Sequence, residues 1–240
     1  ITGDLSGSVF NEEQKKSYLN AHSLLSRILP NLYRDTRGQI NTLGKTAELL
    51  LEENTKCDQE VKDNASVYKQ SICTGREKML ANYRLFKRIF DETGKKVILI
   101  PGNWDGKCLE DVLNMKSAHN NNPENFDGLS FIGYGGSNRV PIEVPQELTT
   151  DFSESEAYTH LIQPEAEKKA DIALTHVSPA GFAGGDSFAV LAYLNLRAPS
   201  LVLCGDTHKL RILNYGETGT IISNPGNLGR YQGEDFGTFL

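Results

Sequence analysis

Five short apolar runs of the chain each end in polar residues of types that bind metal ions. The runs and their endings occupy residues 1–4, 97–103, 172–176, 201–208 and 220–226, and they carry Asp4, Asn103, His176, Asp206 and His208. Runs of Val, Ile and Leu this short are typical of strands buried on both faces, and sites in open α/β sheets lie at the carboxyl ends of such strands. The sequence therefore predicts an α/β protein with a metal site at one edge of its sheet.

The composition argues against two classes of partner. The chain has 240 residues, of which 38% are hydrophobic and 23% are charged, and its formal net charge is −6. No apolar stretch approaches the roughly 20 residues that a membrane-spanning helix needs, so we expect no membrane partner. Because net negative charge opposes nonspecific contact with phosphate backbones, we expect no bulk nucleic-acid binding. Affinity for phosphate must then come from a specific site.

The cysteines indicate a reducing compartment. Cys57, Cys73, Cys108 and Cys204 lie far apart, with no C-x-x-C pair and none of the density of a disulfide scaffold. We therefore expect a cytoplasmic protein. The chain starts at Ile1, inside an expected strand, and we expect a further strand to precede it in the natural protein.

The stretch 11–94 is polar, charged and helical in its periodicity. Leu80, Tyr83, Phe86 and Phe90 recur at spacings of three to four residues, so they should pack inward from one helix face. We expect three or four helices here, with breaks at Pro30 and near residues 37–38 and 43–44.

This helical stretch is longer than a strand crossover requires. A connection between parallel strands needs about a dozen residues or slightly more, so we interpret 11–94 as an insertion after the first strand of a single domain, 1–240. Two roles are open for the insertion. It caps a substrate pocket, or it forms a contact between copies of the chain in a homo-oligomer.

The second half of the chain alternates quickly between strands and turns. Residues 129–134 should form a strand closed by the glycine-rich stretch 135–137, and residues 189–196 a short helix. The remaining histidines, His22, His119 and His160, have no partners at metal-binding spacing, and we interpret them as structural or exposed.

Several of these segments together resemble the calcineurin-like metallophosphoesterase superfamily. That family carries ordered motifs that include Gly-Asp, Gly-Asn-His-Asp, a strand-end His and Gly-His-x-His. The similar segments here are Gly3-Asp4, Gly102-Asn103-Trp104-Asp105, Thr175-His176 and Gly205-Asp206-Thr207-His208, followed by the Asn224-Pro225-Gly226 turn. The resemblance implies a β-sandwich of two facing sheets flanked by helices, in four α/β/β/α layers, with the helical insertion outside it.

The resemblance also implies a dinuclear metal centre. Asp4 would bridge two divalent ions, Asn103, His176 and Asp206 would hold one of them, and His208 would reach the other. Imidazole, amide and carboxylate ligands suit Mn, Fe, Zn, Co or Ni, and the extra carboxylate favours Mn. A metal-bound hydroxide would then attack a phosphoester, with Asp105 orienting a water or the loop that carries Trp104.

The chain departs from the family pattern in three places. The Asp-x-His motif is absent, Asp206 replaces the first His of Gly-His-x-His, and Trp104 stands where many members have a His that assists the leaving group. Because indole has no basic nitrogen, Trp104 cannot transfer a proton, which favours phosphodiesters over phosphomonoesters as substrates. The alternative is a protein that kept the fold as a binding scaffold and has little or no catalytic activity.

Each candidate also has a purely structural interpretation. Asp4 would cap a helix, Asn103 would be an ordinary turn residue, and His176 would be a satisfied core histidine. His208 would pair with the nearby Asp206 carboxylate at the surface. The joint occurrence of these residues at successive strand ends favours the metal site.

Overall fold

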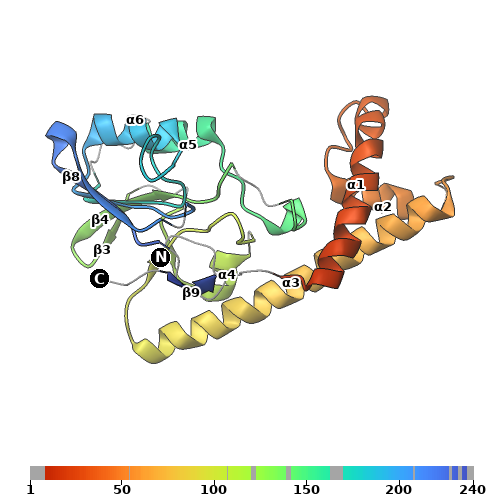
Figure 1. The fold of residues 1–240 in the computed structure, drawn as a ribbon, viewed down its shortest axis with the longest axis horizontal. Coiled ribbons are helices and arrows are strands. Elements are labelled where there is room, and N and C mark those ends of the chain that lie inside the picture. Colours follow the sequence, from red (N-terminus) through yellow and green to blue (C-terminus); the bar gives the residue numbers. More distant parts are fainter. Residues whose placement is uncertain are drawn as a thin grey trace.

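The centre of the molecule is a six-stranded mixed sheet (Figure 1). The structure is a computed structural model that describes residues 9–53, 55–106, 108–119, 123–138, 142–162, 170–207, 209–226, 229–231 and 234–236. The strand order is β3-β4-β5-β6-β8-β7. The strands are β3 (Glu124–Phe126), β4 (Leu129–Tyr134), β5 (Ile172–Thr175), β6 (Leu201–Leu203), β7 (Arg211–Tyr215) and β8 (Thr220–Asn224). Strands β4, β5, β6 and β8 run parallel, and β3 and β7 pair antiparallel at the two edges.

One face of this sheet is covered by two helices, α5 (Glu154–Ile162) and α6 (Phe188–Arg197). Ala173, Val202 and Ile222 point to this side and are almost fully buried in a cluster with apolar residues of both helices. Helix α6 begins where the Ser187 side chain accepts a hydrogen bond from the Val190 amide, which satisfies a free donor of the first turn. The strands and the helix predicted for this half of the chain are confirmed.

The opposite face of the sheet carries a second, smaller layer. Strands β1 (Ile98–Leu99) and β2 (Lys116–Ser117) pair in parallel, and Ile98 and Ile100 pack against Phe131 and Leu174 of the main sheet. A further two-stranded antiparallel sheet is formed by β9 (Gly229–Tyr231) and β10 (Glu234–Phe236). The predicted α/β class is therefore confirmed.

Three helices occupy the stretch between residues 11 and 94. They are α1 (Glu12–Asp35), α2 (Leu43–Leu51) and α3 (Gln59–Thr93), and the short α4 (Leu109–Leu113) lies beside the carboxyl half of α3. Figure 1 shows α1 and α2 against one end of α3, well away from the sheet, while the other end of α3 runs along the α/β body. Asn11 and Gln14 form a reciprocal capping box that fixes the start of α1.

One expectation for these helices is wrong, and a second is confirmed only for Tyr83 and Phe86. Helix α1 continues through Pro30 to Asp35, because the proline ring is exposed and the missing amide removes one hydrogen bond near the helix end. On α3 the fully buried stripe includes Met79 and Tyr83, whereas Leu80 and Phe90 are only half-buried. The buried stripe faces the small cluster around α4 and is narrower than the predicted apolar face.

Nothing in the described part of the structure tests the predicted compartment. Among the residues that the structure describes, none of the helices is both long enough and apolar enough to cross a bilayer. The four cysteines are free thiols. The cytoplasmic assignment stays a prediction.

Candidate metal centre

Three of the predicted ligands meet at the carboxyl ends of three strands. Asn103 lies four residues after the end of β1, His176 directly follows β5, and Asp206 comes three residues after β6. His176 Nε2 lies 3.1 Å from Asn103 Oδ1 and 3.6 Å from Asp206 Oδ1. All three side chains are nearly enclosed, with exposures of 6% for Asn103, 2% for His176 and 9% for Asp206. Residues more than 70 positions apart thus share one small buried site.

The spacing of these donor atoms fits a bound cation. Two ligand atoms that each lie about 2.1 Å from one ion, at angles of roughly 90–115°, are separated by about 3.0–3.5 Å. The distances from His176 Nε2 to the two oxygens, 3.1 and 3.6 Å, match this separation. One imidazole, one amide oxygen and one carboxylate form a mixed donor set that suits a borderline divalent metal.

A buried asparagine supports the backbone beneath His176 and Asp206. The Gly205 amide donates to the His176 carbonyl at 2.9 Å, which ties the two strand ends together. Asn224, at the end of β8, is fully buried, and its Nδ2 donates to the Gly205 carbonyl at 2.8 Å and to Thr207 Oγ1 at 3.0 Å. Asp206 itself has φ +62°, a left-handed conformation that Asp tolerates better than most residues. This network aims the Asp206 carboxylate at the histidine.

The loop that carries Asn103 is held by contacts from several distant elements. Asp105 is fully buried, and its Oδ2 accepts from the Gly102 amide at 2.9 Å while its Oδ1 accepts from the Tyr83 hydroxyl at 3.1 Å. The Thr150 hydroxyl donates to the Asp105 carbonyl at 2.6 Å. The Asp105 carboxylate therefore binds the loop backbone and helix α3, and its predicted role in catalysis stays a prediction.

Two of the predicted ligands lie outside the described residues, namely Asp4 and His208. Within the described ranges, no group of three or more His, Cys, Asp and Glu side chains is placed to hold a metal ion. The described part of the site thus consists of His176 and Asp206 with the Asn103 amide.

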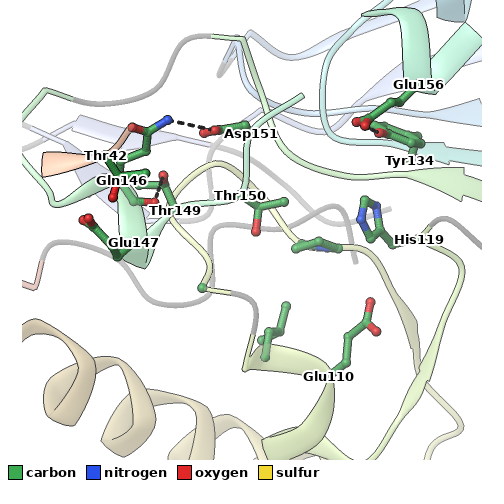
Figure 2. A pocket seen from close by; sticks show the side chains of 13 residues that line it. Thr42, Glu110, His119, Tyr134, Gln146, Glu147, Thr149, Thr150, Asp151 and Glu156 are labelled. Carbon is green, nitrogen blue, oxygen red and sulfur yellow. Dashed lines mark hydrogen bonds between the residues drawn. The ribbon is translucent and has the colours of Figure 1, made fainter. Parts of the chain in front are cut away.

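A cavity of about 510 Å³ opens beside the Asn103 loop (Figure 2). Pro101 and Gly106, which flank that loop, line it together with Glu110, His119, Tyr134, Glu147, Asp151 and Glu156, among others. Thr42, which precedes α2, also lines the cavity, so the helical insertion reaches its rim. The described charged side chains of this lining are acidic, which distinguishes the cavity from a phosphate pocket.

His119 is a cavity residue that the sequence analysis treated as structural or exposed. Its Nδ1 accepts a hydrogen bond from the Gly135 amide at 2.8 Å, and its ring lies 5.1 Å from that of Tyr134. Burial lowers the pKa of His119 from its usual 6.5 to about 4, so the ring is neutral at pH 7. The available sequence signal was its position just after a short strand, β2.

Two basic residues, Lys209 and Arg211, follow Asp206 in the chain. Lys209 Nζ lies 3.7 Å from the position that a Cβ would take at Gly184, and the Arg211 guanidinium lies 5.3 Å from the centre of the Phe182 ring. Both side chains therefore lie near the loop between His176 and α6. Nothing in the local sequence pattern assigned a role to either residue.

Comparison with known proteins identifies little beyond the fold. No family model matches the chain. A stretch of 85 residues is 33% identical to the uncharacterized protein MJ1162 of Methanocaldococcus jannaschii, a match that covers 35% of this chain and 37% of the relative. The match thus spans little more than a third of that protein.

Two solved structures are similar to this chain at low sequence identity. One, with a TM-score of 0.53, is 16% identical and covers 75% of this chain and 73% of its own. The protein TT1561 of Thermus thermophilus has a TM-score of 0.48 and 20% identity over 62% of this chain and 71% of that chain. The first of these likenesses shows a shared fold and says nothing of the reaction.

Proposed function

We propose that this protein is a metal-dependent phosphoester hydrolase of the calcineurin-like metallophosphoesterase type, with phosphodiesters as its preferred substrates. The observation that carries the proposal is the convergence of Asn103, His176 and Asp206. His176 Nε2 lies 3.1 Å from Asn103 Oδ1 and 3.6 Å from Asp206 Oδ1. These three residue types stand at the ends of separate strands, in the order in which the resembling motifs occur. A metal ion held by all three side chains accounts for their meeting in one buried place.

The ligand set that we propose has five members. Asn103, His176 and Asp206 would hold one ion, and Asp4 and His208 would complete a two-ion centre with Mn²⁺ as the favoured metal. When bound, such ions lower the pKa of a coordinated water and neutralise phosphoryl oxygens.

Other residues of the chain would orient the metal ligands and attract the substrate. Asn224 and Gly205 fix the backbone of the two strand ends, so the His176 and Asp206 side chains are oriented before a metal binds. Lys209 and Arg211, close in the chain to Asp206, would attract the negative phosphoryl group towards the same edge.

Trp104 supports the preference for phosphodiesters. Its indole cannot donate a proton to a leaving alkoxide as an imidazolium does, and general acid assistance typically contributes about 10²–10⁴-fold to a rate. In the structure Trp104 is half-buried and packs against the cluster that includes Met79 and Tyr83. Esters with good leaving groups depend least on the missing acid.

The four-layer sandwich is also part of the proposal. Ile212 on β7 and Ile221 on β8 are 53% and 46% exposed. They lie on the same face of the sheet as Phe131 and Leu174, which Ile98 and Ile100 cover at β4 and β5. A second sheet extending from β1 and β2 would bury Ile212 and Ile221 and give two facing sheets between helical layers. Oxidative footprinting of the protein tests this, since a covering sheet requires the Ile212 and Ile221 side chains to be protected from labelling.

The test of the activity is metal binding and turnover by the protein and two matched variants. We expect Mn²⁺ to bind and bis(p-nitrophenyl) phosphate to be hydrolysed, with His176→Ala losing turnover and binding Mn²⁺ at least about 10-fold more weakly. His22→Ala is the control, because His22 lies on α1, far from the strand ends.

Other outcomes of this experiment would distinguish the proposed hydrolase from a binding scaffold without catalytic activity. If the wild-type protein binds no Mn²⁺, Zn²⁺ or Fe²⁺ and does not hydrolyse the diester, the scaffold alternative is supported and the proposed function is wrong. Equal Mn²⁺ affinities and rates for His176→Ala and the wild type would also contradict it, because the ligand assignment would then have no effect.

A further inference from the structure

Tyr83 connects the long helix α3 to the loop that carries Asn103. Its hydroxyl donates to Asp105 Oδ1 at 3.1 Å and accepts from the Gly106 amide at 2.9 Å. The same Asp105 carboxylate accepts from the Gly102 amide at 2.9 Å. One phenol and one carboxylate therefore bind the backbone on both sides of Asn103.

The surroundings of Tyr83 keep this arrangement rigid. The side chain is fully buried, among Leu99 before the loop and Leu109 after it. A Cβ at Gly106 would lie 2.7 Å from Met79 Sδ, one turn before Tyr83 on α3, so a side chain there would require Met79 to move. Helix and loop thus approach closely as well as sharing hydrogen bonds.

The phenol is protonated at any ordinary pH. Burial, and then the charge of Asp105, hold the pKa of Tyr83 far above its usual value. Its single proton is directed to the carboxylate, so its oxygen is available to the Gly106 amide. Phenylalanine at this position would keep the ring contacts and remove both hydrogen bonds.

We propose that Tyr83, a residue of the helical insertion, is a positioning residue for the Asn103 metal ligand. The expected effect of Tyr83 on metal affinity rests on the proposed function. Its expected effect on the conformation of the Asn103 loop rests on the loop geometry alone. Groups that orient metal ligands from outside the coordination shell typically change metal affinity about 10–100-fold when they are removed. The insertion would therefore set the affinity of the metal centre as well as covering part of the body.

Helix α3 provides its own control for a merely structural role. Tyr68, about four turns earlier, is also fully buried and also donates to a carboxylate, Glu147 Oε2, at 3.1 Å. Tyr68→Phe and Tyr83→Phe each remove a phenolic hydroxyl bonded to an acid on the same helix. Of these two tyrosines, Tyr83 is the one that hydrogen-bonds to the loop of Asn103.

Trp104, the single tryptophan of the chain, reports on this loop directly. In the metal-free protein we expect Tyr83→Phe to shift the Trp104 emission and to increase its quenching by acrylamide. The Gly106 amide should exchange about 10-fold faster in this variant, since one buried hydrogen bond is lost. Tyr68→Phe should leave both readouts as in the wild type.

Metal titration completes the test. We expect Tyr83→Phe to bind Mn²⁺ about 10-fold more weakly and to alter the absorption spectrum of bound Co²⁺, while Tyr68→Phe binds as the wild type does. Unchanged Mn²⁺ affinity in Tyr83→Phe would overturn the inference and leave the proposed function standing. No Mn²⁺ binding by the wild type would instead refute the proposed function together with the expected effect of Tyr83 on metal affinity.

The wild-type protein alone also tests the geometry, should the Tyr83→Phe variant not fold. The Gly106 amide must then be protected from exchange in the native protein. An unprotected Gly106 amide would contradict the Tyr83 contact without any substitution.

Discussion

His176 lies between an amide oxygen and a carboxylate oxygen, and the two distances permit different interactions. Asn103 Oδ1, at 3.1 Å, is within hydrogen-bonding range of Nε2, whereas Asp206 Oδ1, at 3.6 Å, is beyond it. A histidine that served only the core would be expected to approach the buried carboxylate more closely. The wider spacing suits a cation that contacts all three atoms, which is why we favour the metal site at this scale.

Substitutions of Asp206 separate its proposed role as a metal ligand from the cost of its left-handed backbone conformation. Because its φ is +62°, Asp206→Gly should relieve strain and raise the free energy of unfolding by about 0.5–1 kcal/mol in EDTA. The same variant should bind Mn²⁺ at least about 10-fold more weakly, since a ligand is lost. Denaturant unfolding and calorimetric titration measure the two effects.

Asp206→Asn is the matched control for this experiment. Asn tolerates the left-handed conformation and keeps an oxygen donor, so unfolding should change little and Mn²⁺ affinity should fall between those of the wild type and Asp206→Gly. If both variants bind Mn²⁺ as the wild type does, Asp206 is not a ligand.

His119 predicts a component of the pH dependence of stability. Its pKa is about 4 in the folded protein and about 6.5 when unfolded, because burial disfavours the charged ring. Below pH 6.5 the unfolded chain binds the proton more strongly, so stability falls between pH 6.5 and 4, by at most about 3 kcal/mol. Above pH 6.5 His119 contributes no slope.

The substitution His119→Asn should remove this component. The Asn side chain keeps an oxygen acceptor for the Gly135 amide and does not titrate. Urea unfolding of both proteins between pH 8 and 4 gives the difference, in which the carboxylates common to both cancel. Parallel stability curves for wild type and variant would show that His119 is not buried as described.

At the scale of elements, apolar runs predicted the central parallel strands, and β5 is buried on both faces as such a run leads one to expect. Alternation within β5 sends Ala173 to the helices and Leu174 to the opposite layer, and both environments are apolar. The strand ends then brought Asn103, His176 and Asp206 together, as the sequence predicted. Local pattern sufficed for these three residues because each lies just beyond the end of a strand.

Contacts between distant elements were beyond the sequence analysis. Tyr83 looked like one member of an apolar stripe, and nothing local shows that its hydroxyl meets Asp105. His119 looked isolated, because its partner Gly135 is 16 residues away on another strand end. Side chains whose role depends on tertiary contact cannot be recognised from spacing alone.

The glycine-rich end of β4 is an element-scale feature with a testable steric cause. A Cβ at Gly135 would lie 2.3 Å from the Pro101 carbonyl oxygen, and the neighbouring Gly136 amide donates to that oxygen at 2.9 Å. Gly135→Ala should therefore destabilise the protein by about 2–3 kcal/mol and weaken Mn²⁺ binding, since Pro101 leads into the Asn103 loop. Thermal unfolding and Mn²⁺ titration measure both.

Gly94→Ala provides the comparison for this steric effect. Gly94 ends α3 with φ +61° and has open space around its Cα, so the variant should lose only about 1 kcal/mol and keep its Mn²⁺ affinity. Equal losses for the two variants would show that the approach to Pro101 is not tight.

At the scale of the whole molecule, the helical insertion is docked on the segment 143–148 of the body. Glu147, in the short helix Gln146–Leu148, accepts from the Gly44 amide at 2.8 Å and from the Tyr68 hydroxyl at 3.1 Å. Lys15 forms an ion pair with Glu143 at 2.6 Å. These contacts set the insertion at the rim of the cavity, and its two proposed roles, as a cap and as a contact between copies, stay predictions.

Glu147 makes this docking testable. Glu147→Gln keeps one acceptor oxygen and loses the charge and the second acceptor, so it should lower the free energy of unfolding by about 1 kcal/mol. If the two contacts act together, the loss in the double variant with Tyr68→Phe is smaller than the sum of the single losses. Glu48→Gln is the matched control, because Glu48 makes only a 3.9 Å ion pair with Lys69 between exposed side chains, and the expected loss is near zero. Additive losses would show that the two contacts act independently, and equal effects of Glu147→Gln and Glu48→Gln would show that Glu147 does not hold the insertion.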